Sequence, residues 1–139
     1  MQVFSVDTGK FKLDGGAMFG VVPKGIWNKI NPADDNNLCT WSLRCLLVID
    51  GERKILIDTG MGDKQDAKFF SHYHPSDTKT IAEALAVHGF TIDEITDVLL
   101  THLHFDHVGG AVNEANGLFT LALPKATYWV SAPHWETAM

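Results

Sequence analysis

Residues 98–107 read VLLTHLHFDH, an apolar run that leads straight into three histidines and an aspartate. Three of the seven histidines of the chain therefore fall within six residues. Imidazole nitrogen and carboxylate oxygen are the ligands that a borderline cation such as Zn²⁺ takes. A structural zinc staple needs four closed ligands, usually with cysteine, and no cysteine is near. The window therefore predicts a metal site, and its place after a strand favours catalysis.

The spacing within the window indicates how the ligands are shared. His102 and His104 lie two residues apart at the end of a strand, so both side chains should leave on the same face. Asp106 and His107 are adjacent and would diverge on extended backbone, but a turn can aim both at a neighbouring position. This pattern suits two metals roughly 3.5–4 Å apart better than one ion with four local ligands. Gly109-Gly110 lets the backbone pass close to the site.

Length and composition limit the classes of protein. The chain has 139 residues, enough for one domain with a real core, and is 45% hydrophobic. A formal net charge of −6 disfavours nucleic acid as a partner. No secretory signal and no membrane-spanning segment are visible, and Cys39 and Cys45 form no disulfide framework. We expect a cytoplasmic protein whose two thiols are small buried side chains.

Hydrophobic periodicity and capping signals predict an α/β fold with a mixed sheet. A capping box at Thr80 starts a helix that Gly89 stops, and Thr91 starts a second, short helix. The run Cys45–Ile49 is apolar on both faces, so we expect this sheet to be covered on both sides. The expected strands are Gln2–Lys12, Thr40–Ile49, Lys54–Asp58, Asp97–Thr101 and Ala126–Val130.

The motif resembles a known family. Thr101-His102-x-His104-x-Asp106-His107-x-Gly109-Gly110 is similar to the signature of the metallo-β-lactamase-fold hydrolases, and Ile57-Asp58-Thr59-Gly60 matches their upstream aspartate motif. The order of elements is similar over nearly the whole chain. The resemblance implies a metallo-β-lactamase-like αββα sandwich, of which residues 1–139 look like the N-terminal half, truncated at the C-terminal end.

The resemblance also implies a role for each motif residue. His102 and His104 would bind the first metal, and Asp106 and His107 the second. Asp106 would be the catalytic residue that positions or deprotonates a bridging hydroxide, and Asp58 would hold the ligand loop from behind, unless it merely caps a turn. We expect two Zn²⁺ per complete domain, although Fe or Mn suits the same ligands.

The chain departs from the family pattern in one respect. A third histidine for the first metal, a bridging aspartate and another histidine come from the second half in the family. After His107 this chain offers only His134, Glu114 and Glu136, none in such a motif. We therefore expect a further segment, a second chain or a homo-oligomer to complete the domain.

Four further residues are candidates for the substrate rim. His72 and His74 lie in a predicted polar loop, where they either serve at the active-site rim as a substrate contact or lid or are plain surface residues. Phe19 and Trp27 belong to an apolar loop that borders the substrate cleft in related proteins, or serves as core or subunit contact.

The expected function is metal-dependent hydrolysis of an ester-like carbonyl, a lactone or small ester, or of an organophosphate. A thioesterase of the glyoxalase II kind is the alternative. A different class also stays open, a non-catalytic half-domain that serves metal binding or subunit association.

Overall fold

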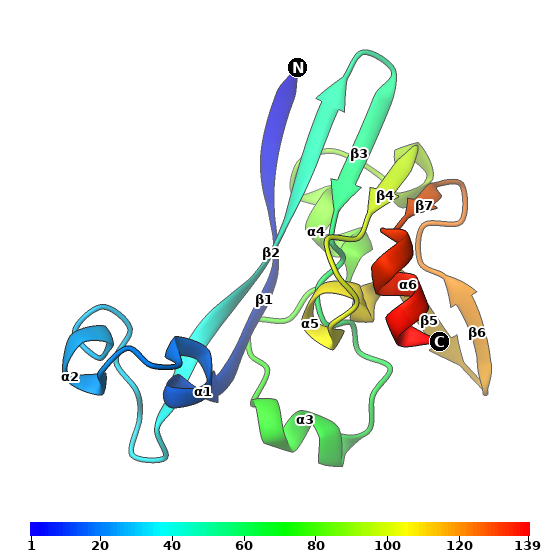
Figure 1. The fold of residues 1–139 in the computed structure, drawn as a ribbon. Helices are drawn as coiled ribbons and strands as arrows, with labels where there is room; N and C mark the ends of the chain where they lie inside the picture. The colour runs from blue at the N-terminus through cyan, green and yellow to red at the C-terminus, as the bar shows by residue number, and fades with distance from the viewer.

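The computed structural model describes residues 1–139, in which five strands form one mixed sheet in the order β1-β2-β3-β4-β7 (Figure 1). The first three strands are antiparallel neighbours, whereas β4 runs parallel to both β3 and β7. The mixed sheet predicted from the sequence is therefore confirmed. The strands of this sheet are β1 (Gln2–Asp14), β2 (Leu38–Asp50), β3 (Arg53–Ile57), β4 (Asp97–Leu99) and β7 (Thr127–Trp129).

The remaining elements are short. A separate hairpin consists of β5 (Val112–Ala115) and β6 (Leu118–Leu121). The α-helices are α1 (Gly15–Phe19), α2 (Lys24–Trp27), α3 (Ala67–Tyr73), α4 (Ile81–Ala86), α5 (Phe105–Val108) and α6 (Ala132–Ala138), with 3₁₀ turns η1 (Ile92–Glu94) and η2 (Gly109–Ala111). None of these helices combines the length and the apolar composition that crossing a bilayer requires.

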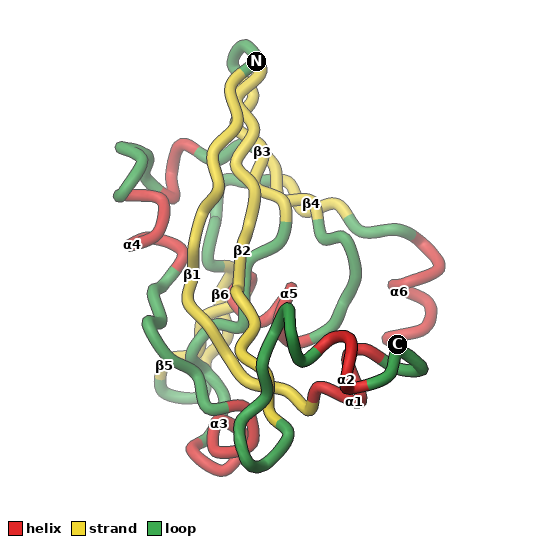
Figure 2. The backbone as a smooth tube through the Cα atoms, turned by 90° about the vertical axis from the view of Figure 1, so that its left-hand side faces the viewer, coloured by secondary structure: helices red, strands yellow, loops and turns green.

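The core lies between one face of the sheet and α4. Leu47, Leu56 and Val98 form a row across three adjacent strands and are fully buried. Figure 2 shows α4 on this side of the sheet, where Leu85 joins the same cluster. The helix begins as predicted, because Thr80 and Glu83 form a reciprocal capping box.

The opposite face of the sheet is open, which corrects the expectation that both faces are covered. Register places Leu46, Ile57, Leu99 and Trp129 in one row across β2, β3, β4 and β7. The exposed fractions are 38% for Leu46, 41% for Leu99 and 52% for Trp129. The run Cys45–Ile49 is apolar on both faces, but its second face stays partly exposed in residues 1–139: Leu46 is 38% exposed and Val48 is half-buried.

Several elements were not predicted from the sequence. The predicted loop around His72 and His74 is wrong, because α3 runs to Tyr73 and His74 caps it in the left-handed region. The Asp66 side chain accepts from the Phe69 N–H and starts this helix. The β5–β6 hairpin after Gly110 does not figure among the predicted strands, and α1, α2 and α5 are too short to produce a helical period.

Both cysteines behave as the sequence predicted. Cys39 and Cys45 are free and buried. Burial raises the pKa of the Cys45 thiol to about 12. Neither thiol is therefore an activated nucleophile or a ready metal ligand.

Candidate metal centre

Two parallel strands bring the predicted site residues together. β3 and β4 pair with Ile57 opposite Leu99, so the segments that follow them leave the sheet side by side. The Asp58 N–H donates to the Leu99 carbonyl at 2.9 Å, and the Thr59 N–H donates to the His107 carbonyl at 2.8 Å. These bonds fasten the aspartate motif to the histidine motif, although 49 residues separate Asp58 from His107.

The three histidines of the motif form one cluster of rings. The centroid of the His102 ring lies 4.0 Å from that of His107 and 4.6 Å from that of His104. The Asp106 carboxylate lies 3.5 Å from Nε2 of His107. The turn that the sequence needed in order to aim Asp106 and His107 is α5, whose first turn carries both residues.

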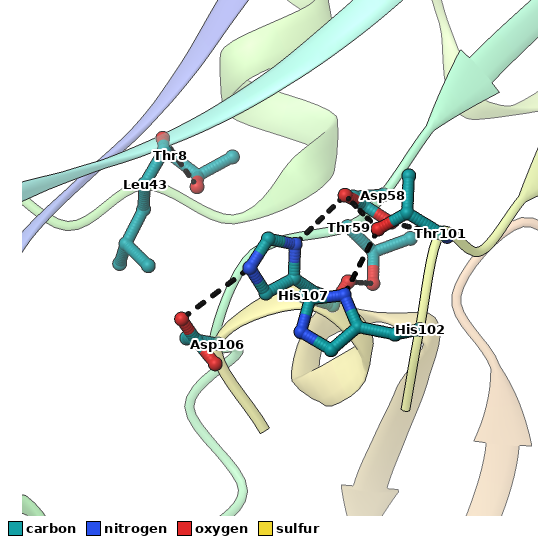
Figure 3. A network of polar contacts seen from close by, with 8 residues as sticks. All are labelled: Thr8, Leu43, Asp58, Thr59, Thr101, His102, Asp106 and His107. Atoms are coloured by element: carbon teal, nitrogen blue, oxygen red, sulfur yellow. Dashed lines mark hydrogen bonds and ion pairs between the residues drawn. The ribbon is translucent and has the colours of Figure 1, made fainter. Parts of the chain in front are cut away.

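Asp58 is the hydrogen-bonding centre behind this cluster (Figure 3). It is 7% exposed and has a positive φ of 60°, which an aspartate adopts only at a cost. Its carboxylate accepts from the Thr101 N–H at 2.8 Å and from the Thr101 hydroxyl at 2.8 and 3.0 Å. Nδ1 of His107 lies 2.8 Å from Oδ2 of the same carboxylate. Asp58 therefore does more than cap its own turn.

The two glycines after the histidines allow the backbone to pack closely. A Cβ on Gly109 would lie 1.9 Å from the Met61 carbonyl oxygen, and one on Gly110 would lie 2.2 Å from the Thr59 carbonyl oxygen. Any larger residue would push the two motifs apart. The Lys64 ammonium also donates to the Gly109 carbonyl, which holds the aspartate loop against the end of the motif.

The environment of His102 favours a neutral imidazole. Burial lowers the pKa of His102, and the neighbouring His107 and His104 rings lower it further when charged. A neutral imidazole is the form that binds a metal.

The four rim candidates lie outside the histidine cluster. Trp27 is only 3% exposed and stacks on Phe19 with ring centroids 4.9 Å apart. This burial favours the alternative of a core contact for Trp27, because its indole packs within the α1–α2 segment. His72 and His74 are exposed and are not among the histidines whose rings approach one another.

α3 reaches the motif through aromatic side chains instead. The Phe105 ring centroid lies 4.4 Å from that of Tyr73 and 5.3 Å from that of Phe69. The sequence did not indicate Phe69 and Tyr73, because it predicted a polar loop where α3 presents these aromatic side chains. His134 of α6 was also not selected, and its ring lies 6.4 Å from that of His102. No local spacing links His134 to the motif, so only the fold shows this neighbour.

The types of donor atom in the cluster suit a metal ion, but their arrangement does not enclose one. Nitrogen and carboxylate oxygen meet here, and in both His102 and His107 Nδ1 has a polar partner, so Nε2 is the nitrogen available to a cation. Yet no three histidine, cysteine, aspartate or glutamate side chains are arranged as a group that could hold one ion. The chemistry of the donor set fits a metal, whereas these residues alone do not enclose one.

One cavity borders the two motifs at Thr59 and Gly110 without including the histidines. It measures about 550 Å³, and none of the four predicted ligands lines it. Its walls include Thr8, Lys79, Glu83 and Asn113. This cavity therefore does not mark the candidate metal centre. The centre is identified by its imidazole nitrogens and carboxylate oxygen, which are specific for metal binding.

Residues 43–127 match the family model of the metallo-beta-lactamase superfamily. The chain belongs to this superfamily. The match spans the aspartate motif of β3 and the whole histidine motif, the two segments that the hydrogen bonds of Asp58 join. The predicted α/β architecture of the family is thereby confirmed.

Solved structures of superfamily members resemble the whole chain. A probable metal-dependent hydrolase from Staphylococcus aureus is 30% identical with a TM-score of 0.89, over 97% of this chain and 48% of that one. AidC, a dizinc quorum-quenching lactonase, is 27% identical with a TM-score of 0.73, over 96% and 42%. The hydrolase AbOPH is 27% identical with a TM-score of 0.72, over 97% and 43%.

The coverage is unequal in every pair. The chain spans about half the length of these structures or somewhat less, while they span nearly all of it. The resemblance therefore establishes the fold of residues 1–139, and it concerns only part of each neighbouring enzyme.

Proposed function

We propose that this protein is a metal-dependent hydrolase of an ester-like carbonyl, a lactone or small ester in the first place. The observation that carries the proposal is the cluster of His102, His104 and His107 beside Asp106, with ring centroids 4.0 and 4.6 Å apart. The superfamily neighbours include a dizinc lactonase, which favours this substrate class and a two-zinc centre. An organophosphate is a further substrate to test.

Each residue of the chain has a distinct task in this proposal. His102 and His104 would hold one metal, and Asp106 and His107 a second, through imidazole nitrogen and carboxylate oxygen. Bound metal would supply a hydroxide at neutral pH and polarise the carbonyl. Asp106 would position that nucleophile, and Asp58 would orient His107 through Nδ1 at 2.8 Å.

The same residues also bear on the substrate class, the cellular location and the source of the remaining ligands. A hydrolase of this kind acts on a small molecule, and the net charge of −6 gives no reason to expect a nucleic acid. Two buried free thiols suit the reducing cytoplasm. The ligands beyond this set would come from a further segment or from a second chain, because no three donors here enclose an ion.

The test measures metal and activity on the same purified full-length protein. Elemental analysis should find about two metals per chain and identify them as Zn, Fe or Mn. An acyl-homoserine lactone, a 4-nitrophenyl ester and paraoxon should distinguish the carbonyl and phosphorus substrates, and S-lactoylglutathione tests the thioesterase alternative. The double variant His102→Ala/His104→Ala should lose both metal and activity, by roughly 100-fold or more.

His88→Ala is the matched histidine control, because His88 contacts the Ser5 carbonyl in β1 and lies outside the motif. It should keep metal and turnover. Metal without hydrolysis of any of these substrates would favour the non-catalytic alternative. Absence of metal from the wild-type protein would overturn the proposal.

A further inference from the structure

The Thr101 hydroxyl touches two groups at once. Its oxygen lies 2.8 and 3.0 Å from the two oxygens of Asp58 and 3.1 Å from Nδ1 of His102 (Figure 3). A threonine hydroxyl carries a single hydrogen and accepts through its lone pairs. The direction of both contacts therefore follows from where that hydrogen points.

The carboxylate decides the direction. An ionised carboxylate only accepts hydrogen bonds, so the Thr101 hydrogen points to Asp58. The contact with His102 is then a hydrogen bond only if Nδ1 carries a proton and donates to Thr101. By the same reasoning Nδ1 of His107 donates directly to Asp58. Nε2 is then unprotonated in both imidazoles: in His107 the 2.8 Å contact of Nδ1 with Asp58 is a hydrogen bond, whereas the Asp106 carboxylate lies 3.5 Å from Nε2.

We propose that Thr101 is a positioning residue that relays Asp58 to His102, so that one buried carboxylate sets the ring tautomer of two histidines. The inference rests on the proposed function, in which a metal needs the unprotonated Nε2 of both rings. An imidazole without a partner carries its proton on either nitrogen, and one tautomer then blocks the ligand position. The hydroxyl of Thr101 removes that choice at His102, where no carboxylate contacts Nδ1.

Substitution can test the effect of the Thr101 hydroxyl apart from the structural role of the Thr101 backbone. The Thr101 N–H also donates to Oδ1 of Asp58 at 2.8 Å, and this backbone bond anchors the loop whatever the side chain is. Thr101→Val removes the hydroxyl, keeps the shape and leaves that bond in place. Thr101→Ser keeps the hydroxyl and should behave as the wild type.

The experiment records long-range ¹H–¹⁵N spectra of ¹⁵N-histidine-labelled full-length protein after metal removal. The His102 signals are assigned by their loss in His102→Gln. In the wild type we expect the proton on Nδ1 of both His102 and His107. In Thr101→Val His102 should shift toward protonation at Nε2, whereas His107 should not change. Zn²⁺ affinity, measured by chelator competition, should fall roughly 10–100-fold and return in Thr101→Ser.

Thr96→Val is the matched control. The Thr96 hydroxyl also donates to a carboxylate, that of Asp97 at 2.7 Å, but contacts no histidine. The Thr96→Val variant should leave the histidine tautomers and the Zn²⁺ affinity unchanged, while losing about as much thermal stability as Thr101→Val. Protonation of His102 at Nε2 in the wild type, or an unchanged His102 tautomer in Thr101→Val, would overturn the relay. Correct tautomers in a wild-type protein that binds no metal would support the relay and refute the proposed function.

Discussion

At the scale of single residues, buried aspartates organise this molecule. Asp58 joins the two sequence motifs, and Asp97 joins three strands. Asp97 is nearly buried and accepts from the Arg53 guanidinium at 2.8 and 3.2 Å, from the Thr96 hydroxyl at 2.7 Å and from the Trp129 indole N–H at 2.8 Å. Arg53 lies in β3, Trp129 in β7 and Thr96 just before β4, so the Asp97 carboxylate ties three neighbouring strands together.

The buried Asp97 carboxylate predicts a dependence of stability on acid. The hydrogen bond from Arg53 and those from Thr96 and Trp129 hold the pKa of Asp97 well below its usual range. A carboxylate whose folded pKa is depressed stabilises the fold above its unfolded pKa of about 3.9, and this contribution is lost as pH falls toward the folded pKa. Asp97→Asn should lower the free energy of unfolding by about 1–2 kcal/mol at pH 7.

Urea denaturation between pH 7 and pH 2 measures this effect. The difference between Asp97→Asn and the wild type should shrink below a pH of about 4. Asp50→Asn, at an exposed position in β2, should match the wild type throughout. A constant difference at every pH would show that the charge of Asp97 is not what stabilises the sheet.

At the scale of elements, the short segments between strands carry the site. α5 contributes Asp106 and His107, and the 3₁₀ turn after it starts with Gly109 against the Met61 backbone. The contact between these two loops is backbone against backbone. The two loops can approach this closely because glycine has no side chain. The hydrogen bond from the Thr59 N–H to the His107 carbonyl depends on this short separation.

Gly109→Ala tests this contact. The new methyl group would lie 1.9 Å from the Met61 carbonyl oxygen, and backbone cannot yield as a flexible side chain would. We expect a loss of about 1–3 kcal/mol in the free energy of unfolding, measured by urea denaturation. Gly25→Ala in α2 is the control, because open space surrounds that position and alanine favours the helix. Equal midpoints for the wild type and Gly109→Ala would refute the close approach.

At the scale of the whole molecule, the sheet has one covered and one open face. α4 covers the first, whereas Leu46, Leu99 and Trp129 lie exposed in one row on the second. Monomeric proteins rarely leave a continuous apolar row across several strands in water. Residues 1–139 on their own therefore carry a surface suited to association.

Residues 1–139 expressed alone should bind the dye ANS through this face. The double variant Leu46→Thr/Leu99→Thr should reduce ANS fluorescence and self-association by light scattering, and should change the free energy of unfolding by about 1 kcal/mol or less. Val87→Thr, at a solitary exposed position after α4, should reduce neither signal. A loss of several kcal/mol in the double variant would instead show that the two leucines are buried.

The amino-acid sequence determined most of the sheet and the identity of the motifs. Long strands such as β1 and β2 and the Thr80 capping box carry local signals, which are alternation, hairpin turns and caps. Short segments such as α3, α5 and β5–β6 carry no period long enough to be recognised, and packing against distant residues decides them. Phe69 and Tyr73 on Phe105 are one example.

The candidate site divides in the same way. Its histidines and aspartates were recognisable from the sequence because their types and spacing reflect ligand chemistry. Only the tertiary structure decided that Asp58 faces His107, that Thr101 connects Asp58 to His102, and that one face of the sheet stays open. These facts depend on two strands far apart in the chain ending side by side, and no local pattern of residues encodes a distance between them.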